Sequence, residues 1–401
     1  MRIMIVNTYY YPEILGGAEY SVKKLAEQLQ AMKHEVRVLC TGDSDSVGKV
    51  DGIEVMRFNP VNSCRGIHYK NYSKIRRGIR FFQDIWNPLN ARKITKAIEN
   101  FGPDVIHTNG LYDITPIIWK IAKKHGIRVV HTVRDYHLMC PGSTLSCRQN
   151  PEGCEKIKLL CRLHRDLHRK QSAFVDCVTA PSQQTLGIII ADGFFRGAKH
   201  YVIENAIDFE MSNVKEIYKN REKKNDTVTK YVYLGNLSEQ KGILWLIETF
   251  KEIVNEKICL VIAGKGPLEE QVKKECEKDN RIKFVGFLNE KGVDKLLRDC
   301  DVLICPSLWA EPFGRVVLDA YKHAMPVITS DSGALPELVD NGKTGYSIPA
   351  SDRQALAKAV AYYADNREER LCHGLAATEL LQRFSLETQA KRFLKIYCGE
   401  N

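Results

Sequence analysis

Two hydrophobic patterns alternate along the chain: short continuous apolar runs, and longer segments with apolar residues every three or four positions. Continuous β-branched runs are typical of strands buried on both faces of a parallel sheet, and the longer period indicates amphipathic helices such as Ser21–Ala31. The first series of predicted strands comprises Arg2–Asn7, Val36–Thr41, Val105–Thr108, Val129–Val133, Val175–Ala180 and Tyr201–Ile203.

The alternation is interrupted between Phe209 and Thr229, where the sequence KEIYKNREKKNDT is polar and charge-rich and therefore predicts a linker. Strands alternating with helices form βαβ units, and a second such series follows the linker. The chain is thus predicted to be an α/β protein with two Rossmann-like domains, residues 1–208 and 209–384, before a last helix at Leu386–Tyr397. The second series of strands comprises Tyr231–Leu234, Ile258–Ala263, Ile282–Val285, Val302–Cys305 and Val327–Thr329.

Length and composition agree with two ordinary domains, because 401 residues is about twice a typical domain. The formal net charge of +10 favours acidic partners such as nucleotide phosphates or anionic membranes, or serves solubility alone. No nucleic-acid motif accompanies the charge, so we expect no nucleic-acid partner. The 13 cysteines are odd in number and several lie in apolar runs, which favours a reducing compartment. Without a signal-peptide pattern or a run of about 18 apolar residues, we expect a cytoplasmic protein, either free or peripheral on the inner face of the cell membrane.

A glycine pair follows the first predicted strand in the sequence PEILGGAEYSVKKLAEQL. Gly16 and Gly17 lie where the loop turns into a helix, and free N–H groups at a helix start attract anions. The pair also fits an ordinary tight turn. The fingerprint Gly-x-Gly-x-x-Gly is absent from this position, which argues against a nicotinamide enzyme.

The sequence SLWAEPFGRVVLDA follows the strand at Val302–Cys305. Pro312 is expected in the first turn of a helix, which places Glu311 at the helix start. Asp319 would lie about two turns, or ~12 Å, further on, a spacing that suits a sugar at one end and a ribose at the other. The N–H groups of Phe313, Gly314 and Arg315 would be unpaired in this first turn and able to face hydroxyls or an anion.

A lysine beside a glycine, Lys241, ends the sequence YLGNLSEQKG after the first strand of the second domain. Ligands of open α/β sheets bind at the carboxyl ends of the strands, so this lysine is a candidate phosphate contact. A solvated lysine is the alternative.

Taken together, the segments EPFGRVVLDA, AGKGPLEEQV, CDVLICPS, GALPELVDNGKTGY and the early GGAE resemble a family-four retaining glycosyltransferase of the GT-B fold. The resemblance covers nearly the whole chain. It implies two Rossmann-like domains whose parallel sheets face across a central cleft. It also implies an acceptor-binding N-terminal domain, a nucleotide-sugar-binding C-terminal domain, and a last helix, about residues 385–401, that packs on the first domain.

The same resemblance implies roles for individual residues of the second domain. Glu311 matches the glutamate beside the transferred sugar, and Asp319 takes the position that grips the ribose hydroxyls. Lys241 matches a diphosphate-binding lysine, whereas Asn236 stands where the family has an arginine. Phe287 and Leu288 match the edges of the base pocket.

In the first domain, Gly17 matches a backbone donor to the distal phosphate, beside Gly16. His107 matches the first histidine of a catalytic His-x-His, and Asn109 stands at the second position. His131 lies in HTVRD, which resembles a second family motif. A structural role is the alternative for both histidines.

The reaction implied is hexosyl transfer with retention from a UDP- or GDP-linked sugar to a glycan or lipid-linked acceptor, as in bacterial surface-polysaccharide biosynthesis. No cofactor or metal is expected to be required. The alternatives are a nucleotide-sugar epimerase of the same fold, or a partner subunit that binds a nucleotide sugar without turnover, since Asp319, Asn236 and Asn109 depart from the family pattern.

Two further features indicate other candidate sites. Cys140, Cys147, Cys154 and Cys161 recur every seven residues in a segment with Pro and Gly. This suits a structural zinc site, with free thiols or a fortuitous disulfide as the alternatives. Residues 65–86 carry basic and aromatic side chains, among them Arg65, Lys70 and Arg80. That composition suits an anionic membrane surface or the diphosphate of a lipid-linked acceptor, with a solvated basic face as the alternative.

Overall fold

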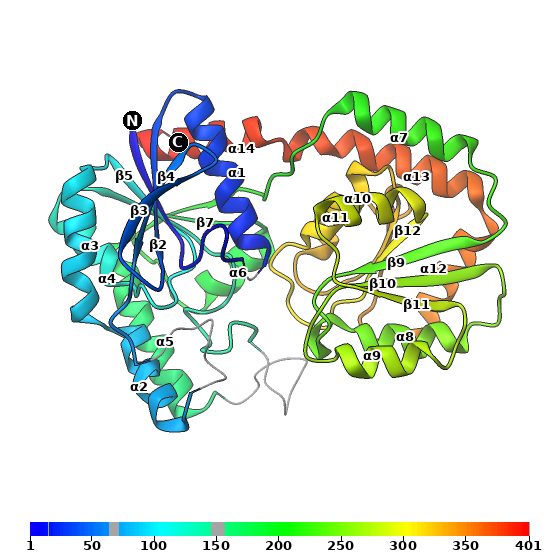
Figure 1. The fold of residues 1–401 in the computed structure, drawn as a ribbon, viewed down its shortest axis with the longest axis horizontal. Helices are drawn as coiled ribbons and strands as arrows, with labels where there is room; N and C mark the ends of the chain where they lie inside the picture. The colour runs from blue at the N-terminus through cyan, green and yellow to red at the C-terminus, as the bar shows by residue number, and fades with distance from the viewer. Residues whose placement is uncertain (15, 64–71, 146–156, 401) are drawn as a thin grey trace. The chain divides into compact units, whose positions relative to one another are not determined.

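The computed structural model describes residues 1–14, 16–63, 72–145 and 157–400, which form two compact units (Figure 1). Unit 1 comprises the described residues up to Ala206 together with the C-terminal segment from Leu386. Unit 2 comprises Ile207–Ser385. Each unit is built on its own sheet, as the two series of apolar runs predict.

The sheet of unit 1 has the strand order β3-β4-β2-β1-β5-β6-β7-β8, and every pair is parallel except β3 with β4. The six predicted strands of this unit are confirmed to within two residues at each end. The two further strands, β3 and β4, were missed because they are polar or alternating rather than continuously apolar. The strands are β1 (Arg2–Val6), β2 (Glu35–Thr41), β3 (Ser46–Val50), β4 (Ile53–Phe58), β5 (Val105–Thr108), β6 (Arg128–Thr132), β7 (Cys177–Ala180) and β8 (Lys199–Val202).

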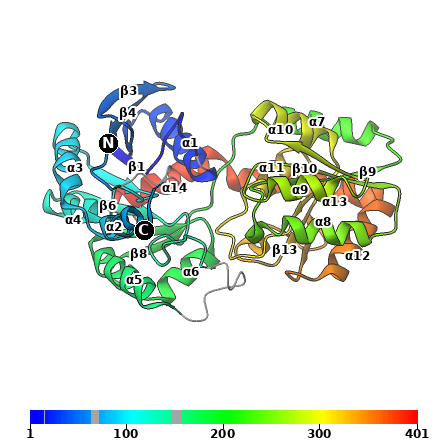
Figure 2. The same cartoon turned by 60° about the horizontal axis from the view of Figure 1, so that its bottom comes forward.

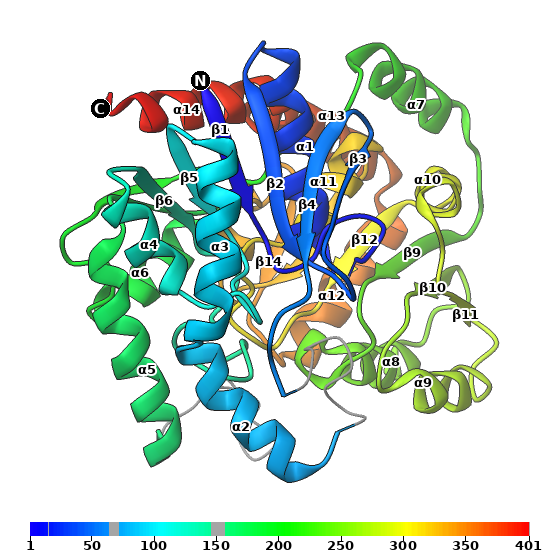
Figure 3. The same cartoon turned by 60° about the vertical axis from the view of Figure 1, so that its left-hand side comes forward.

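Helices cover this sheet, and the last helix of the chain is among them. Helix α14 contacts α1, and its Tyr397 hydroxyl lies 2.6 Å from His107 Nδ1 on β5 (Figures 1 and 3). Helices α2 and α5, which are far apart in sequence, also contact each other. The helices are α1 (Gly17–Ala31), α2 (Lys74–Ile85), α3 (Pro88–Phe101), α4 (Ile117–Lys124), α5 (Leu159–Gln171), α6 (Gln183–Ala191) and α14 (Leu386–Cys398).

Unit 2 is a parallel sheet in the order β11-β10-β9-β12-β13-β14, with helices on its faces such as the adjacent α8 and α9 (Figure 2). The five predicted strands are confirmed. The strands are β9 (Thr229–Leu234), β10 (Ile258–Ala263), β11 (Ile282–Gly286), β12 (Val302–Cys305), β13 (Val327–Ser330) and β14 (Gly345–Ile348). The helices are α7 (Met211–Lys223), α8 (Ile243–Glu252), α9 (Glu269–Cys276), α10 (Glu290–Asp299), α11 (Arg315–Lys322), α12 (Arg353–Asp365) and α13 (Arg367–Glu379).

The linker predicted between the two series is wrong, because most of it forms α7. Val214, Ile217 and Arg221 recur at helical spacing and are buried on one face. The Arg221 guanidinium donates to the carbonyls of Leu297, Cys300 and His323, each at 2.6 Å. A charged residue therefore forms part of the buried face of α7.

In both sheets the strand order reverses at one place, between β1 and β5 in unit 1 and between β9 and β12 in unit 2. Loops that leave the carboxyl ends of such strands run in opposite directions, and the space between them is where open α/β sheets bind ligands.

Candidate functional site

In unit 2, the loop after β12 carries Glu311, whose carboxylate is the acceptor for several donors. Its Oε2 accepts from Ser307 Oγ at 3.1 Å and from Trp309 Nε1 at 2.9 Å. The same oxygen forms an ion pair with Lys241 Nζ, which comes from the loop after β9. Only 9% of Glu311 is exposed. The two loops that flank the reversal of strand order thus bring together two residues predicted separately.

Lys241 ends a short 3-10 helix, Glu239–Lys241, and Gly242 then begins α8. Its ammonium lies 5.1 Å from the centre of the Trp309 ring, a geometry in which ring and cation attract. The lysine side chain keeps about a quarter of its surface exposed. An ammonium group and the start of a helix therefore lie side by side, and both favour a negative charge.

Backbone packing fixes the Glu311 loop. Gly333 has φ +62°, and a Cβ there would lie 2.2 Å from the Glu311 nitrogen. The next residue, Ala334, donates its N–H to the Glu311 carbonyl at 2.8 Å. No side chain fits at position 333, so this glycine allows the loop after β13 to pack directly against the backbone of Glu311.

The helix predicted to begin at Pro312 begins three residues later. Gly314, at φ +91°, is the N-cap, and α11 starts at Arg315. Glu311 therefore lies in the loop and not in the first turn, and Asp319 is one turn inside the helix. The ~12 Å spacing between the two acids therefore cannot be derived as a helical rise, because only the four steps from Arg315 to Asp319, or ~6 Å, are helical.

Phe313 is a core residue, 4% exposed, with its ring edge-on to Phe384. Its side chain is therefore not a ligand contact, and only its backbone N–H, the group named from the sequence, could face a ligand. Asp319 and Arg315 lie one turn apart on α11, 4.0 Å from Oδ1 to Nη2. Both side chains are partly exposed.

Asn236 is exposed in the loop after β9, and Phe287 and Leu288 follow β11. Phe287 is 65% exposed, and Lys265 Nζ lies 4.5 Å from its ring centre. Sequence reasoning missed Lys265 and Trp309. Lys265 is a lysine between two glycines directly after a strand, the same signal that singled out Lys241.

In unit 1, Gly16 and Gly17 are exposed at the N-terminus of α1. The Gly16 N–H donates to Glu19 Oε2 at 2.9 Å. This is half of a capping box, because a glycine has no side chain to return the bond. One N–H of the helix start is therefore already occupied, and the Glu19 charge lies beside it.

His107 is fully buried and both of its ring nitrogens have partners. Nδ1 lies 2.6 Å from Tyr397 Oη and Nε2 lies 2.6 Å from Thr132 Oγ1. Burial is the main cause that holds its pKa well below the ordinary value. This is the geometry of a neutral core histidine that ties α14 to β5.

His131, at the end of β6, lines a polar pocket with Asn109, Arg134, Asp135 and His137. Its Nδ1 lies 2.9 Å from Thr108 Oγ1 and its ring stacks on Phe195. Burial lowers its pKa to about 3, so the ring is neutral near pH 7. Of the two histidines, this is the one that borders a pocket.

Two predicted sites fall partly outside the described residues. For the zinc hypothesis, Cys147 and Cys154 lie outside them, whereas Cys140 and Cys161 lie within the described residues, both partly exposed. Within the described ranges, no group of three or more His, Cys, Asp or Glu side chains could hold a metal ion.

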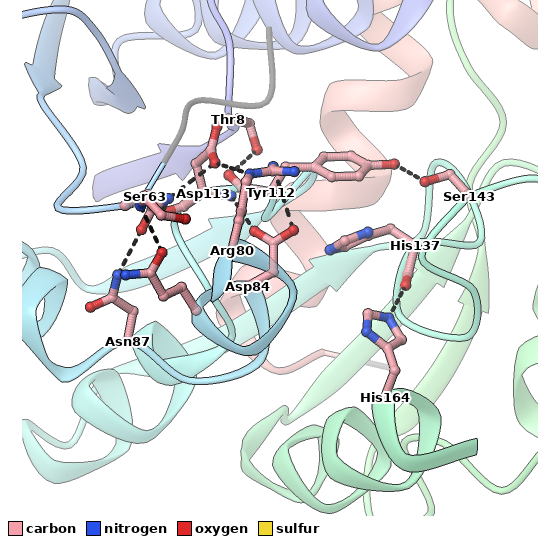
Figure 4. A network of polar contacts seen from close by, with 12 residues as sticks. Thr8, Ser63, Arg80, Asp84, Asn87, Tyr112, Asp113, His137, Ser143 and His164 are labelled. Atoms are coloured by element: carbon pink, nitrogen blue, oxygen red, sulfur yellow. Dashed lines mark hydrogen bonds and ion pairs between the residues drawn. The ribbon is translucent and has the colours of Figure 1, made fainter. Parts of the chain in front are cut away.

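Of the basic segment, residues 64–71 lie outside the described part, Arg65 and Lys70 among them. Arg80 is not a surface cation. It is buried, with Nε 3.0 Å from Asp113 Oδ1 and Nη2 3.4 Å from Asp84 Oδ2 (Figure 4). Across the ranges that are described, no helix is long and apolar enough to cross a bilayer.

Comparison with known proteins places this geometry among sugar-transferring enzymes. Residues 15–211 match the family described as Glycosyltransferase Family 4, and residues 214–378 match Glycosyl transferases group 1. A Klebsiella pneumoniae protein, an uncharacterized 42.6 kDa protein in the cps region, is 28% identical over 84% of this chain and 87% of its own. The Escherichia coli O-antigen chain mannosyltransferase C is 23% identical over 92% and 90%.

A solved structure shares the fold. The Anabaena protein HepE in complex with UDP superposes with a TM-score of 0.70 at 19% identity, and the match covers 100% of both chains.

Proposed function

Because this chain belongs to the family-four glycosyltransferases with the GT-B fold, we propose that it transfers a hexosyl group, with retention, from a nucleotide-diphosphate sugar. The acceptor is a glycan or a lipid-linked sugar in polysaccharide biosynthesis. The observation that carries the proposal is the Lys241–Glu311 pair at the strand-order reversal of unit 2. The cps-region protein and the O-antigen mannosyltransferase support the choice of acceptor class.

In this proposal Lys241 binds the donor diphosphate and Glu311 binds the transferred sugar. Lys241 is bound to Glu311 in the structure, and a diphosphate carries more negative charge than one carboxylate. We expect the donor to draw the ammonium toward the phosphates, which leaves the Glu311 oxygens available to sugar hydroxyls. The starts of α8 and α11 add positive potential.

The remaining donor contacts follow the predicted positions. Asn236 and the backbone of Gly16, Gly17, Phe313, Gly314 and Arg315 serve the phosphates and sugar. Asp319 serves the ribose, and Phe287 and Leu288 serve the base. HepE binds UDP, which supports a uridine donor, with guanosine as the alternative.

The chemistry follows from these positions and needs no metal. The acceptor hydroxyl bonds to the anomeric carbon on the face from which the diphosphate departs, and the departing phosphate oxygen takes the hydroxyl proton. Lys241 stabilises the charge that grows on the diphosphate, a term typically worth ~10²–10³ in rate. His131 positions the acceptor as a neutral imidazole, and His107 supports the strand beside it.

A membrane surface on unit 1 is part of this proposal. Helices α2 and α5 lie against each other (Figure 3) and expose apolar side chains that a protein facing only water would tend to bury. Arg76 and Arg162 are exposed on the same two helices. Apolar side chains flanked by cations suit an anionic lipid surface. The exposed apolar residues, here called the α2–α5 patch, are Ile75, Ile79, Phe82, Trp86, Leu159, Leu160 and Leu163.

A donor screen tests the function. UDP- and GDP-sugars are ranked by the rise they cause in melting temperature, and the best is incubated with lipid-linked and free glycan acceptors. Proton NMR of the product then reads the anomeric configuration. We expect transfer with the donor's configuration kept. Inversion would contradict the retaining mechanism, and binding without turnover for every acceptor would favour a partner subunit.

A further inference from the structure

A polar pocket in unit 1 has features that the donor site does not use. It lies in the loops after β5 and β6, which are neighbouring parallel strands, and β5 adjoins the reversal of strand order. The pocket is lined by Asn109, which follows β5, and by Arg134, Asp135 and His137, which follow β6. This is the edge of the sheet where ligands of such folds bind.

Arg134 brings a positive charge that has no direct counter-ion. Its Nε donates to Asn109 Oδ1 at 2.8 Å and its Nη1 to Asn205 Oδ1 at 2.6 Å. Both acceptors are neutral amides. Within the described part of the chain, Arg134 forms no ion pair, and its Nη2 forms no hydrogen bond.

Holding a guanidinium in this state is costly. Burial lowers the pKa of Arg134 to about 10, although the Glu19 charge acts against the shift from a distance. A partly buried cation without a counter-ion is rarely retained for stability alone. The two amides fix its direction, and the planar fork matches the oxygens of a phosphate.

His137 is the second unsatisfied group of the pocket. It is 5% exposed, and neither Nδ1 nor Nε2 has a hydrogen-bond partner among the described residues. Its ring centre lies 3.9 Å from that of Tyr112 (Figure 4). The Tyr112 hydroxyl and the backbone N–H of His137 both donate to the Asp135 carboxylate, each at 2.8 Å. The ring is thus fixed while its nitrogens stay unpaired, and the Asp135 oxygens are occupied.

We propose that this pocket binds a phosphate group of a substrate, with Arg134 as the charged contact and His137 as a hydrogen-bonding contact. The inference rests on the proposed function, since it assigns a substrate phosphate to unit 1. Arg134 Nη1 and Nη2 face the phosphate oxygens, and the neutral His137 ring can donate to one of them. The phosphate comes from a lipid-phosphate acceptor or from the donor diphosphate, and the test separates the two.

The test measures calorimetric binding of geranyl phosphate and of UDP to the full chain. Arg134→Gln is compared with wild type and with Arg128→Gln. Arg128 is the matched control, since it lies at the other end of β6 and also binds neutral acceptors, the Ile396 carbonyl and Cys177 Sγ. We expect Arg134→Gln to bind one ligand about 10- to 100-fold more weakly, and Arg128→Gln to bind both as wild type does.

The ligand affected identifies the source. Weaker geranyl phosphate binding assigns the pocket to the acceptor, and weaker UDP binding assigns it to the donor. Asn205→Asp serves as a second variant that keeps side-chain size, because it places a carboxylate beside Arg134 Nη1 and should weaken the same ligand.

Folded Arg134→Gln and Asn205→Asp proteins that bind both ligands as wild type does would overturn the inference. Wild-type UDP binding would still stand in that case, so the proposed function would survive. A wild-type chain that binds neither UDP nor GDP would instead count against the proposed function.

Discussion

At the residue scale, unit 1 is unusual for its buried histidines. His137, His164 and His168 form a cluster with ring centres 4.1–5.8 Å apart. All three are at most 5% exposed. The His137 carbonyl accepts from His164 Nε2 at 2.7 Å (Figure 4). The His164 carbonyl lies 2.9 Å from His168 Nδ1. Packing rings this closely requires them to be neutral.

Acid should therefore destabilise unit 1. Burial lowers the pKa of His168 to about 3, so the unfolded chain takes up a proton below pH ~6.5 and the folded chain does not. The contribution of His168 to the free energy of unfolding is complete above that pH and is lost as the pH falls, by ~2 kcal/mol at pH 5. Urea unfolding at pH 7.5 and at pH 5 measures this difference in the free energy of unfolding.

The variant His168→Gln should show a smaller difference between the two pH values than wild type, whatever its stability at pH 7.5. The exposed His125→Gln is the control, and its pH dependence should match wild type. An equal acid sensitivity in His168→Gln and wild type would show that His168 is not the source.

At the scale of elements, the packing of Gly333 against Glu311 can be tested by comparison with Gly342, a glycine of similar backbone conformation. Gly333 and Gly342 both have positive φ, +62° and +75°, but only Gly333 has a backbone atom in the place of a Cβ. We expect Gly342→Ala to lower the free energy of unfolding by ~1 kcal/mol and Gly333→Ala by more than ~3 kcal/mol. Gly333→Ala should also weaken UDP binding. Equal losses of stability would mean that the close packing behind Glu311 is not required.

Most strands could be predicted from sequence because central parallel strands are continuously apolar, as in Ile258–Ala263. The failures have physical causes. Helix α7 was missed because its buried face ends in a charged residue, Arg221. The Arg221 guanidinium donates to three backbone carbonyls that are distant in sequence, and these contacts cannot be predicted from the sequence pattern. The start of α11 was misplaced because Gly314 at positive φ, rather than Pro312, ends the loop.

For the site, Lys241 and Glu311 could be found from their places after β9 and β12. Their ion pair could not be found, because it depends on the packing of two loops 70 residues apart. The Arg134 pocket was missed for the same reason. The two amides that accept from Arg134, Asn109 and Asn205, are distant from it in sequence. The lack of a counter-ion for an arginine can be recognised only in the three-dimensional structure.

At the scale of the whole molecule, the net charge of +10 and the α2–α5 patch together predict binding to anionic vesicles. Replacing Phe82 and Leu159 by serine should reduce flotation with phosphatidylglycerol vesicles at least several-fold, since each buried apolar side chain contributes roughly 1.5–3 kcal/mol. Val254→Ser is the control, because Val254 is exposed but lies in unit 2. Equal flotation of the double variant and wild type would contradict the membrane surface.

If Lys241 holds the negative charge of the donor in unit 2, its removal must slow sugar transfer. Initial rates of sugar transfer measure this most directly, with Lys241→Ala compared with wild type and with Lys230→Ala. Lys230 lies on the same strand-loop segment, near the opposite end of β9, and pairs with Asp299. We expect a rate lower by ~10²–10³ for Lys241→Ala and an unchanged rate for Lys230→Ala. A folded Lys241→Ala protein that turns over at the wild-type rate would contradict it.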